Sequence, residues 1–128
     1  DIINVHDCGK LINPALAEAQ VHGGMSMGIG YALSEQELFD SRSGRTLNNN
    51  LLDYKLSTFM DHPHLEAQFV ENAEPTSAYG TKALGEPPAC PVAPAIRNAV
   101  LNATGVSINT IPMTPHVLFE EFTKNGLI

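Results

Sequence analysis

The fold of this chain depends on the run NPALAEAQVHGGMSMGIGYALSEQELF, which extends from Asn13 to Phe39. Asn13 is a favourable N-cap, and Pro14 is tolerated at the first helical position because its missing N–H has no intrahelical partner there. Apolar residues then recur at helical spacing, so the sequence predicts a helix from Pro14 to about Phe39. The remaining elements can be placed around this helix.

The predicted helix contains four glycines, Gly23, Gly24, Gly28 and Gly30. A glycine inside a helix costs about 1 kcal/mol relative to alanine. Only glycine lets another group come close to the helix axis, because it has no Cβ. The four glycines therefore indicate close packing, either against another backbone or against a cofactor.

Shorter elements are predicted on both sides of the helix. We expect strands at residues 2–7 and 65–70, a strand or extended segment at 51–60, turns at 41–44 and 62–64, and helices at 92–104 and 115–125. Gly105 and Gly126 close the last two helices. Residues 75–91 are expected to be irregular. This order predicts an α+β fold, in which a small mixed sheet packs against helices.

The composition suits one domain that is covered in part by other protein. The chain has 128 residues, and 43% of them are hydrophobic, which is enough to build a core. Charged residues make up only 16%, against about 25% in a typical domain. Because the chain does not begin with Met and opens on a strand pattern, we expect residue 1 to be a boundary inside a longer subunit.

Several kinds of site and partner are disfavoured by the composition. The net charge is −7 and there is no basic run, so nucleic acid is not an expected partner. No apolar run approaches the roughly 20 residues of a membrane span. Two distant cysteines favour a reducing, cytoplasmic setting, and no spacing predicts a metal ion held by protein side chains. We expect Cys8, Cys90, Met25 and Met27 to be packed residues, and the five histidines are scattered.

The irregular stretch AYGTKALGEPP, residues 78–88, is long for a connection inside a small domain. Long ordered loops often carry function. Gly85 permits close approach by a ligand, and Pro87 restricts Glu86 to extended backbone. A carboxylate on such a stiff segment suits a catalytic base, although a solvated loop carboxylate near a helix start has the same local pattern. Lys82 could pair with a substrate or with Glu86, or it could shape the loop.

Five segments carry a family resemblance: DCGKLINP at 7–14, QVHGGMSMGIG at 20–30, NLLDYK at 50–55, Gly85-Glu86-Pro87-Pro88 preceded by Lys82-Ala83, and PMTP at 112–115. In this order they resemble the xanthine dehydrogenase/aldehyde oxidase family of molybdenum hydroxylases. Residues 85–88 resemble the GEPP signature of that family. The resemblance covers nearly the whole chain and is strongest to the C-terminal part of the molybdenum-binding subunit of bacterial xanthine dehydrogenases. It implies that residues 1–128 are the C-terminal portion of a molybdopterin-binding domain.

The resemblance also implies roles for individual residues. Glu86 matches the catalytic glutamate that removes a proton from the oxygen to be transferred to the substrate. Gln20 matches a glutamine whose amide hydrogen-bonds the molybdenum–pterin cofactor, and Gly23 and Gly85 are expected beside that cofactor. The pterin, rather than a protein side chain, would hold the metal. Helix packing explains Gly23 nearly as well, and a solvent-facing amide is the alternative for Gln20.

The activity implied by the resemblance is oxidative hydroxylation of a purine such as hypoxanthine or xanthine. Electrons would pass through iron–sulfur clusters and FAD, held on other subunits or domains, to NAD⁺. The same fold could instead act on an aldehyde, a CoA thioester or another N-heterocycle, or it could be a non-catalytic interaction module. We expect the 128 residues alone to be inactive and, because the strand at 2–7 offers a free edge, to self-associate.

Overall fold

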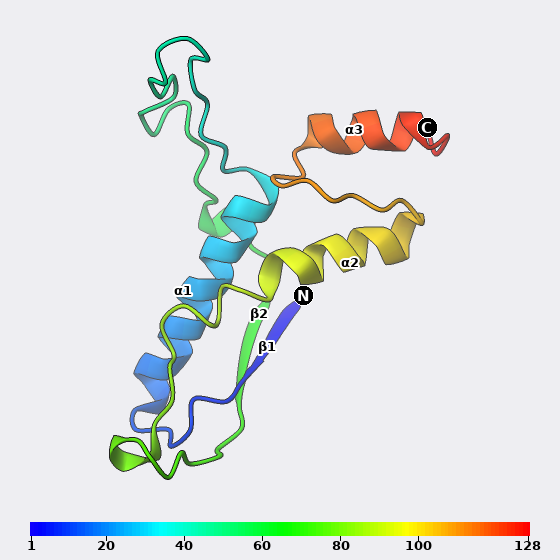
Figure 1. Cartoon of the computed structure of the whole chain (residues 1–128). Helices are drawn as coiled ribbons and strands as arrows, with labels where there is room; N and C mark the ends of the chain where they lie inside the picture. Colours follow the sequence, from blue (N-terminus) through cyan, green and yellow to red (C-terminus); the bar gives the residue numbers. More distant parts are fainter.

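The computed structural model describes residues 1–128 and confirms an α+β fold. The long helix α1 lies beside a two-stranded sheet, and α2 and α3 extend away from it (Figure 1). In chain order the elements are β1 (Ile2–His6), α1 (Pro14–Leu33), the 3₁₀ turn η1 (Phe59–Asp61), β2 (Leu65–Phe69), the 3₁₀ turn η2 (Ala78–Gly80), α2 (Val92–Thr104) and α3 (Pro115–Lys124).

Helix α1 begins as predicted and ends six residues earlier than predicted. The side chain of Asn13 accepts a hydrogen bond from the Leu16 N–H, which is the expected N-cap. The helix stops at Leu33 because the side chain of Asn48 hydrogen-bonds the backbone of the segment that follows. Asn48 accepts from the N–H of Leu38 at 2.8 Å and donates to the carbonyl of Gln36 at 2.7 Å. These bonds hold residues 36–38 in a non-helical conformation.

The two strands are parallel and are connected through α1, which packs on the sheet. Ile2 pairs with Leu65 and His6 pairs with Phe69 at the two ends of the register. Parallel strands need a crossover connection, and here the crossover contains α1. Just beyond β1, Gly9 pairs with Thr81 in an isolated antiparallel bridge. The sheet is therefore small, as expected, but its named strands are all parallel.

Two apolar clusters hold the helices in place. The first consists of Val21, Met25 and Ile29 of α1 together with Val92 of α2, and the strands pack against it. The second consists of Val106, Ile108 and Met113, which α2 and α3 cover. The first cluster fixes the start of α2, and hence the end of the preceding loop, against α1.

The prediction of a strand or extended segment at residues 51–60 is wrong over most of its length. Residues 51–54 form a turn, and Phe59 begins the short η1. The cause is local, because the side chain of Asn50 accepts hydrogen bonds from the N–H groups of Leu52 and Asp53. An asparagine that satisfies nearby backbone donors in this way competes with a strand.

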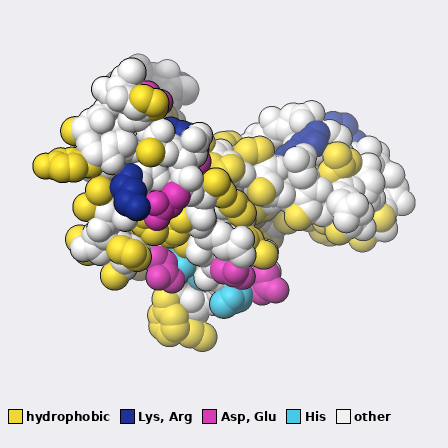
Figure 2. Space-filling model, turned by 90° about the horizontal axis from the view of Figure 1, so that it is seen from below, with side chains coloured by type: hydrophobic (Ala, Val, Ile, Leu, Met, Phe, Trp, Pro, Cys, Tyr) yellow, Lys and Arg dark blue, Asp and Glu magenta, His cyan; other side chains and the backbone are white.

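Strand β1 buries its polar side chains and exposes its apolar ones. Asn4 and His6 are only 6% and 8% exposed, whereas Ile3 and Val5 are 57% and 59% exposed. Figure 2 shows exposed hydrophobic side chains distributed over the surface, between charged groups of both signs. A half-buried strand normally has the opposite pattern. The buried Asn4 and His6 therefore need a specific set of polar partners.

No helix in the chain combines the length and the apolar character that a membrane-spanning helix requires.

Candidate functional site

The segment that contains Glu86 faces the middle of α1 across a cavity of about 760 Å³. Five of its lining residues come from α1 and four from the loop before α2: Gln20, Gly23, Gly24, Met27, Tyr31, Gly85, Glu86, Ala89 and Cys90. All four residues that the sequence singled out, Gln20, Gly23, Gly85 and Glu86, line this one cavity. They are 62 or more positions apart across the two segments, so only the fold brings them together.

The α1 side of the cavity follows from helical spacing. Gln20, Gly23, Met27 and Tyr31 are three or four positions apart, and residues at this spacing share one helix face. Met27 is 63% exposed, so the expectation that it fills a core gap is wrong, whereas Met25 is fully buried as expected. One face of α1, which includes Met25, therefore packs in the core, and the adjacent face, which includes Met27, lines the cavity.

The helix glycines divide into packing positions and one open position. A Cβ on Gly24 would lie 2.7 Å from the Cβ of Pro88, and one on Gly28 would lie 2.5 Å from the Cβ of Val92. These two glycines therefore let the loop and α2 pack directly on α1. A Cβ on Gly23 would meet nothing within 4 Å. Gly23 leaves open space above the helix, on the side where the cavity lies.

On the loop side, Glu86 is exposed while Pro88, two residues later, is buried. The carbonyl of Glu86 accepts a hydrogen bond from the N–H of Ala89 at 3.0 Å, which closes a turn. The thiol of Cys90 lies 3.6 Å from the same carbonyl. Cys90 is exposed and lines the cavity, which corrects the expectation that it is packed; Cys8 is buried as expected.

Three side chains outside the loop hold its backbone. Asn4 Nδ2 donates to the carbonyl of Pro88 at 3.0 Å, His6 Nε2 lies 3.2 Å from the carbonyl of Ala83, and the Tyr31 hydroxyl donates to the carbonyl of Ala89 at 2.8 Å. None of these three residues was predicted as part of the site from the sequence. The signal available was two polar residues, Asn4 and His6, at alternate positions of a predicted strand.

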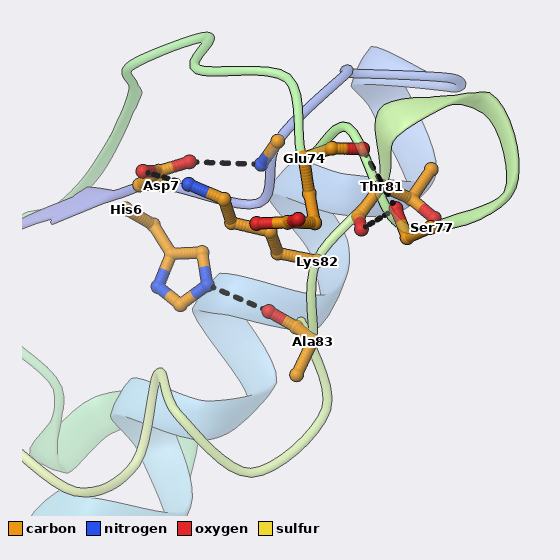
Figure 3. A network of polar contacts seen from close by, with 8 residues as sticks. His6, Asp7, Glu74, Ser77, Thr81, Lys82 and Ala83 are labelled. Carbon is orange, nitrogen blue, oxygen red and sulfur yellow. Dashed lines mark hydrogen bonds and ion pairs between the residues drawn. The ribbon is translucent and has the colours of Figure 1, made fainter.

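Lys82 shapes the loop and does not pair with Glu86. Its Nζ lies 2.7 Å from Asp7 Oδ2, and its backbone N–H donates to the carbonyl of Cys8 at 2.8 Å. Figure 3 shows Lys82 reaching toward Asp7, with His6 beside it and directed at Ala83. The hydrogen bond from Lys82, followed by that from the Gly9 N–H, lowers the pKa of Asp7 below its ordinary value.

The cavity suits a planar organic cofactor better than a metal ion held by side chains. No group of three or more His, Cys, Asp or Glu residues lies close enough together to bind a metal. A Cβ on Gly23 would meet nothing within 4 Å, so there is open space beside α1 at this position. The exposed carboxamide of Gln20 lies beside Gly85, with Nε2 3.9 Å from the position that a Cβ on Gly85 would occupy. An amide both donates and accepts, as recognition of a pterin edge requires. The residues present therefore fit a pterin-bound metal.

Comparison with known proteins supports this assignment. A family model described as a molybdopterin cofactor-binding domain matches residues 1–63. A putative xanthine dehydrogenase molybdenum-binding subunit of Escherichia coli K12 is 63% identical over 99% of the chain. The molybdenum-binding subunit of an aldehyde oxidoreductase from the same organism is 37% identical over 88% of the chain. The chain spans only 17% and 16% of the lengths of these two relatives.

Two solved structures are similar to this chain over nearly its whole length. Quinoline 2-oxidoreductase from Pseudomonas putida 86 superposes with a TM-score of 0.86 at 32% identity, over 94% of this chain and 16% of that one. A Cu,Mo-CO dehydrogenase superposes with a TM-score of 0.87 at 29% identity, over 98% of this chain and 16% of that one.

The fold is thus that of a molybdopterin cofactor-binding domain. The chain belongs to the xanthine dehydrogenase/aldehyde oxidase family of molybdenum hydroxylases.

Proposed function

We propose that residues 1–128 form the C-terminal portion of the molybdopterin-binding domain of a larger subunit that hydroxylates a purine oxidatively. The name and the 63% identity of the Escherichia coli relative favour hypoxanthine or xanthine as substrate. The aldehyde oxidoreductase relative, at 37% identity, makes an aldehyde the second candidate. In either case a substrate C–H and a water molecule become C–OH, with release of two protons and two electrons.

The observation that carries the proposal is the position of Glu86. Its carboxylate is exposed on a stiff turn, in the wall of a cavity whose other wall contains Gln20 and Gly23. The bound molybdenum–pterin group would supply the centre that accepts the two electrons. Glu86 would act as the catalytic base, because its carboxylate oxygen can take the proton from the water-derived oxygen as that oxygen attacks the substrate carbon.

The α1 residues would hold and orient the cofactor. The carboxamide of Gln20 can donate to and accept from the edge of the pterin, which fixes its rotation in the cavity. Gly23 would let the ring system approach the helix backbone, and Gly85 would give it the same freedom on the loop side. The protein thereby keeps the reacting atoms near Glu86, and correct placement contributes strongly to the rate.

The two electrons must then leave the site. We propose that iron–sulfur clusters and FAD, on partner subunits or on other domains, carry them to NAD⁺. This chain contributes none of those centres in our proposal. It contributes the base and one wall of the cofactor cavity.

The substrate assignment can be tested with the full-length subunit, assembled with its partners and loaded with cofactor. Turnover is measured with xanthine and with an aromatic aldehyde, using an artificial electron acceptor, alongside the molybdenum content. We expect a higher kcat/KM for xanthine. A higher kcat/KM for the aldehyde would replace the purine assignment, and no turnover of either compound by fully loaded protein would contradict both.

The role of Gln20 needs a separate measurement. Gln20→Leu is expected to lower the molybdenum content of the purified subunit, whereas Glu18→Leu, two positions away on α1 and outside the cavity lining, is expected to leave it unchanged. Equal molybdenum contents in the two variants would remove Gln20 from the cofactor site.

A further inference from the structure

The inner face of β1 carries two buried polar residues where a strand of this kind normally carries apolar ones. Asn4 and His6 are both buried, and apolar Ile3 and Val5 lie on the outer face. Burial of an amide or an imidazole costs free energy unless hydrogen bonds satisfy it. Each side chain makes a hydrogen bond to a carbonyl group of the same distant loop, Asn4 to Pro88 O and His6 to Ala83 O.

These two contacts flank Glu86 on both sides. Ala83 precedes Glu86 by three residues and Pro88 follows it by two. Tyr31, from α1, holds the next carbonyl, that of Ala89, at 2.8 Å. Burial first, and the neighbouring Cys90 second, raise the pKa of Tyr31 above its ordinary value. Three donors from two different elements thus hold the backbone on both sides of one exposed carboxylate.

We propose that Asn4, His6 and Tyr31 are positioning residues, which fix the carboxylate of Glu86 in the cavity by holding the carbonyls of Pro88, Ala83 and Ala89. This inference rests on the proposed role of Glu86 as the base. Glu86 itself is exposed, so the rigidity of its turn must come from the backbone around it. A small displacement of a base costs rate steeply, which explains why a strand would keep costly polar groups in its buried face.

Tyr31→Phe gives the cleanest test, because it removes one hydroxyl and retains the ring. Tyr54→Phe is the matched control, since the Tyr54 hydroxyl also makes a 2.8 Å hydrogen bond, to Glu35, outside the cavity lining. In the full-length, loaded enzyme with xanthine, we expect Tyr31→Phe to lower kcat about tenfold or more, with KM and molybdenum content unchanged. Tyr54→Phe should match the wild type in all three quantities.

A second readout does not depend on turnover. Hydrogen–deuterium exchange of the peptide that covers residues 83–91 should become faster in Tyr31→Phe and in Asn4→Leu, and should stay the same in Tyr54→Phe. Asn4→Leu keeps the number and branching of the side-chain heavy atoms and removes the hydrogen-bonding amide. Because Asn4→Leu could fail to fold, the result for Tyr31→Phe decides whether the proposal holds.

A double-mutant cycle separates positioning from a general loss of structure. If Tyr31 acts through Glu86, Tyr31→Phe should have no further effect on the residual kcat of a Glu86→Gln enzyme. The proposal is overturned if Tyr31→Phe behaves like Tyr54→Phe, or if it lowers kcat by the same factor in both backgrounds. Full turnover by the Glu86→Gln single variant would instead refute the proposed role of Glu86 as the base. In that case there would be no base for Asn4, His6 and Tyr31 to position.

Discussion

Lys82 forms an ion pair with Asp7, at 2.7 Å between Nζ and Oδ2, and thereby joins the loop before Glu86 to the turn after β1. The two residues are 75 positions apart. The backbone N–H of Lys82 also donates to the carbonyl of Cys8, the residue after Asp7. Both the side chain and the backbone of Lys82 therefore hold the loop against this turn. The start of the Glu86 loop is therefore fixed by charge as well as by hydrogen bonds.

This ion pair predicts a pH dependence of stability. The pKa of Asp7 is lowered from its ordinary value of 3.8, chiefly by Lys82. A lowered carboxyl pKa stabilises the folded state above the unfolded-state pKa, and this contribution is lost as the pH falls through the lowered value. Lys82→Met should therefore unfold at a lower urea concentration than wild type at pH 7, and the difference should shrink below about pH 4. A difference that grows on acidification would contradict the assignment.

Gly23 and Gly24 are neighbours with opposite expected responses to alanine. Gly24→Ala places a Cβ against Pro88 and should destabilise the protein by about 1–3 kcal/mol in urea denaturation. Gly23→Ala meets open space and should stabilise the apoprotein by up to about 1 kcal/mol, because alanine favours helix. If the cofactor approaches here, Gly23→Ala should nevertheless lower the molybdenum content of the full-length subunit. Full loading of Gly23→Ala would show that the cofactor lies elsewhere.

The 128 residues alone should have no hydroxylase activity. They supply Glu86 and one lined cavity, and they correspond to about a sixth of the length of the relatives they match. The expected result is no detectable turnover of xanthine by the isolated chain after incubation with cofactor. Turnover at the rate of the full-length enzyme would mean that these residues contain a complete site.

The isolated chain should also self-associate. Large apolar side chains are exposed on several surfaces, including Ile3 and Val5 of β1 and Phe59 and Met60 of η1, and each strand has a free edge. Exposed apolar patches and open strand edges favour association. Light scattering over a range of concentrations should show dimers or larger species, and Ile3→Lys should reduce them. A monomer at every concentration would disprove this prediction.

The sequence predicted the elements that depend on local signals. Asn13-Pro14 marked the start of α1, and Gly105, with φ of 73°, ends α2 at the expected residue. It failed where a distant or competing side chain decides the backbone. Asn48 ends α1 early, and Asn50 replaces the expected strand with a turn. Neither effect leaves a periodic pattern that can be recognised in the sequence.

The candidate site could be predicted in part. The family motifs identified Gln20, Gly23, Gly85 and Glu86, and the structure places all four around one cavity. The motifs did not identify Asn4, whose partner is a backbone carbonyl 84 residues away. Polar Asn4 and His6 at alternate positions of a predicted strand indicate a polar strand face, but their partners depend on how β1 packs against the loop and do not follow from sequence spacing.

The catalytic role of Glu86 is tested by the turnover of Glu86→Gln in the full-length, cofactor-loaded subunit, compared with that of Glu18→Gln. Both substitutions keep the side-chain shape and remove one carboxylate, but only Glu86 lines the cavity. We expect Glu86→Gln to retain its molybdenum and to lose about 10²–10⁴-fold in kcat, the usual contribution of a general base, and we expect Glu18→Gln to match the wild type. Equal turnover of the two loaded variants would contradict the catalytic role of Glu86 and favour a non-catalytic interaction module.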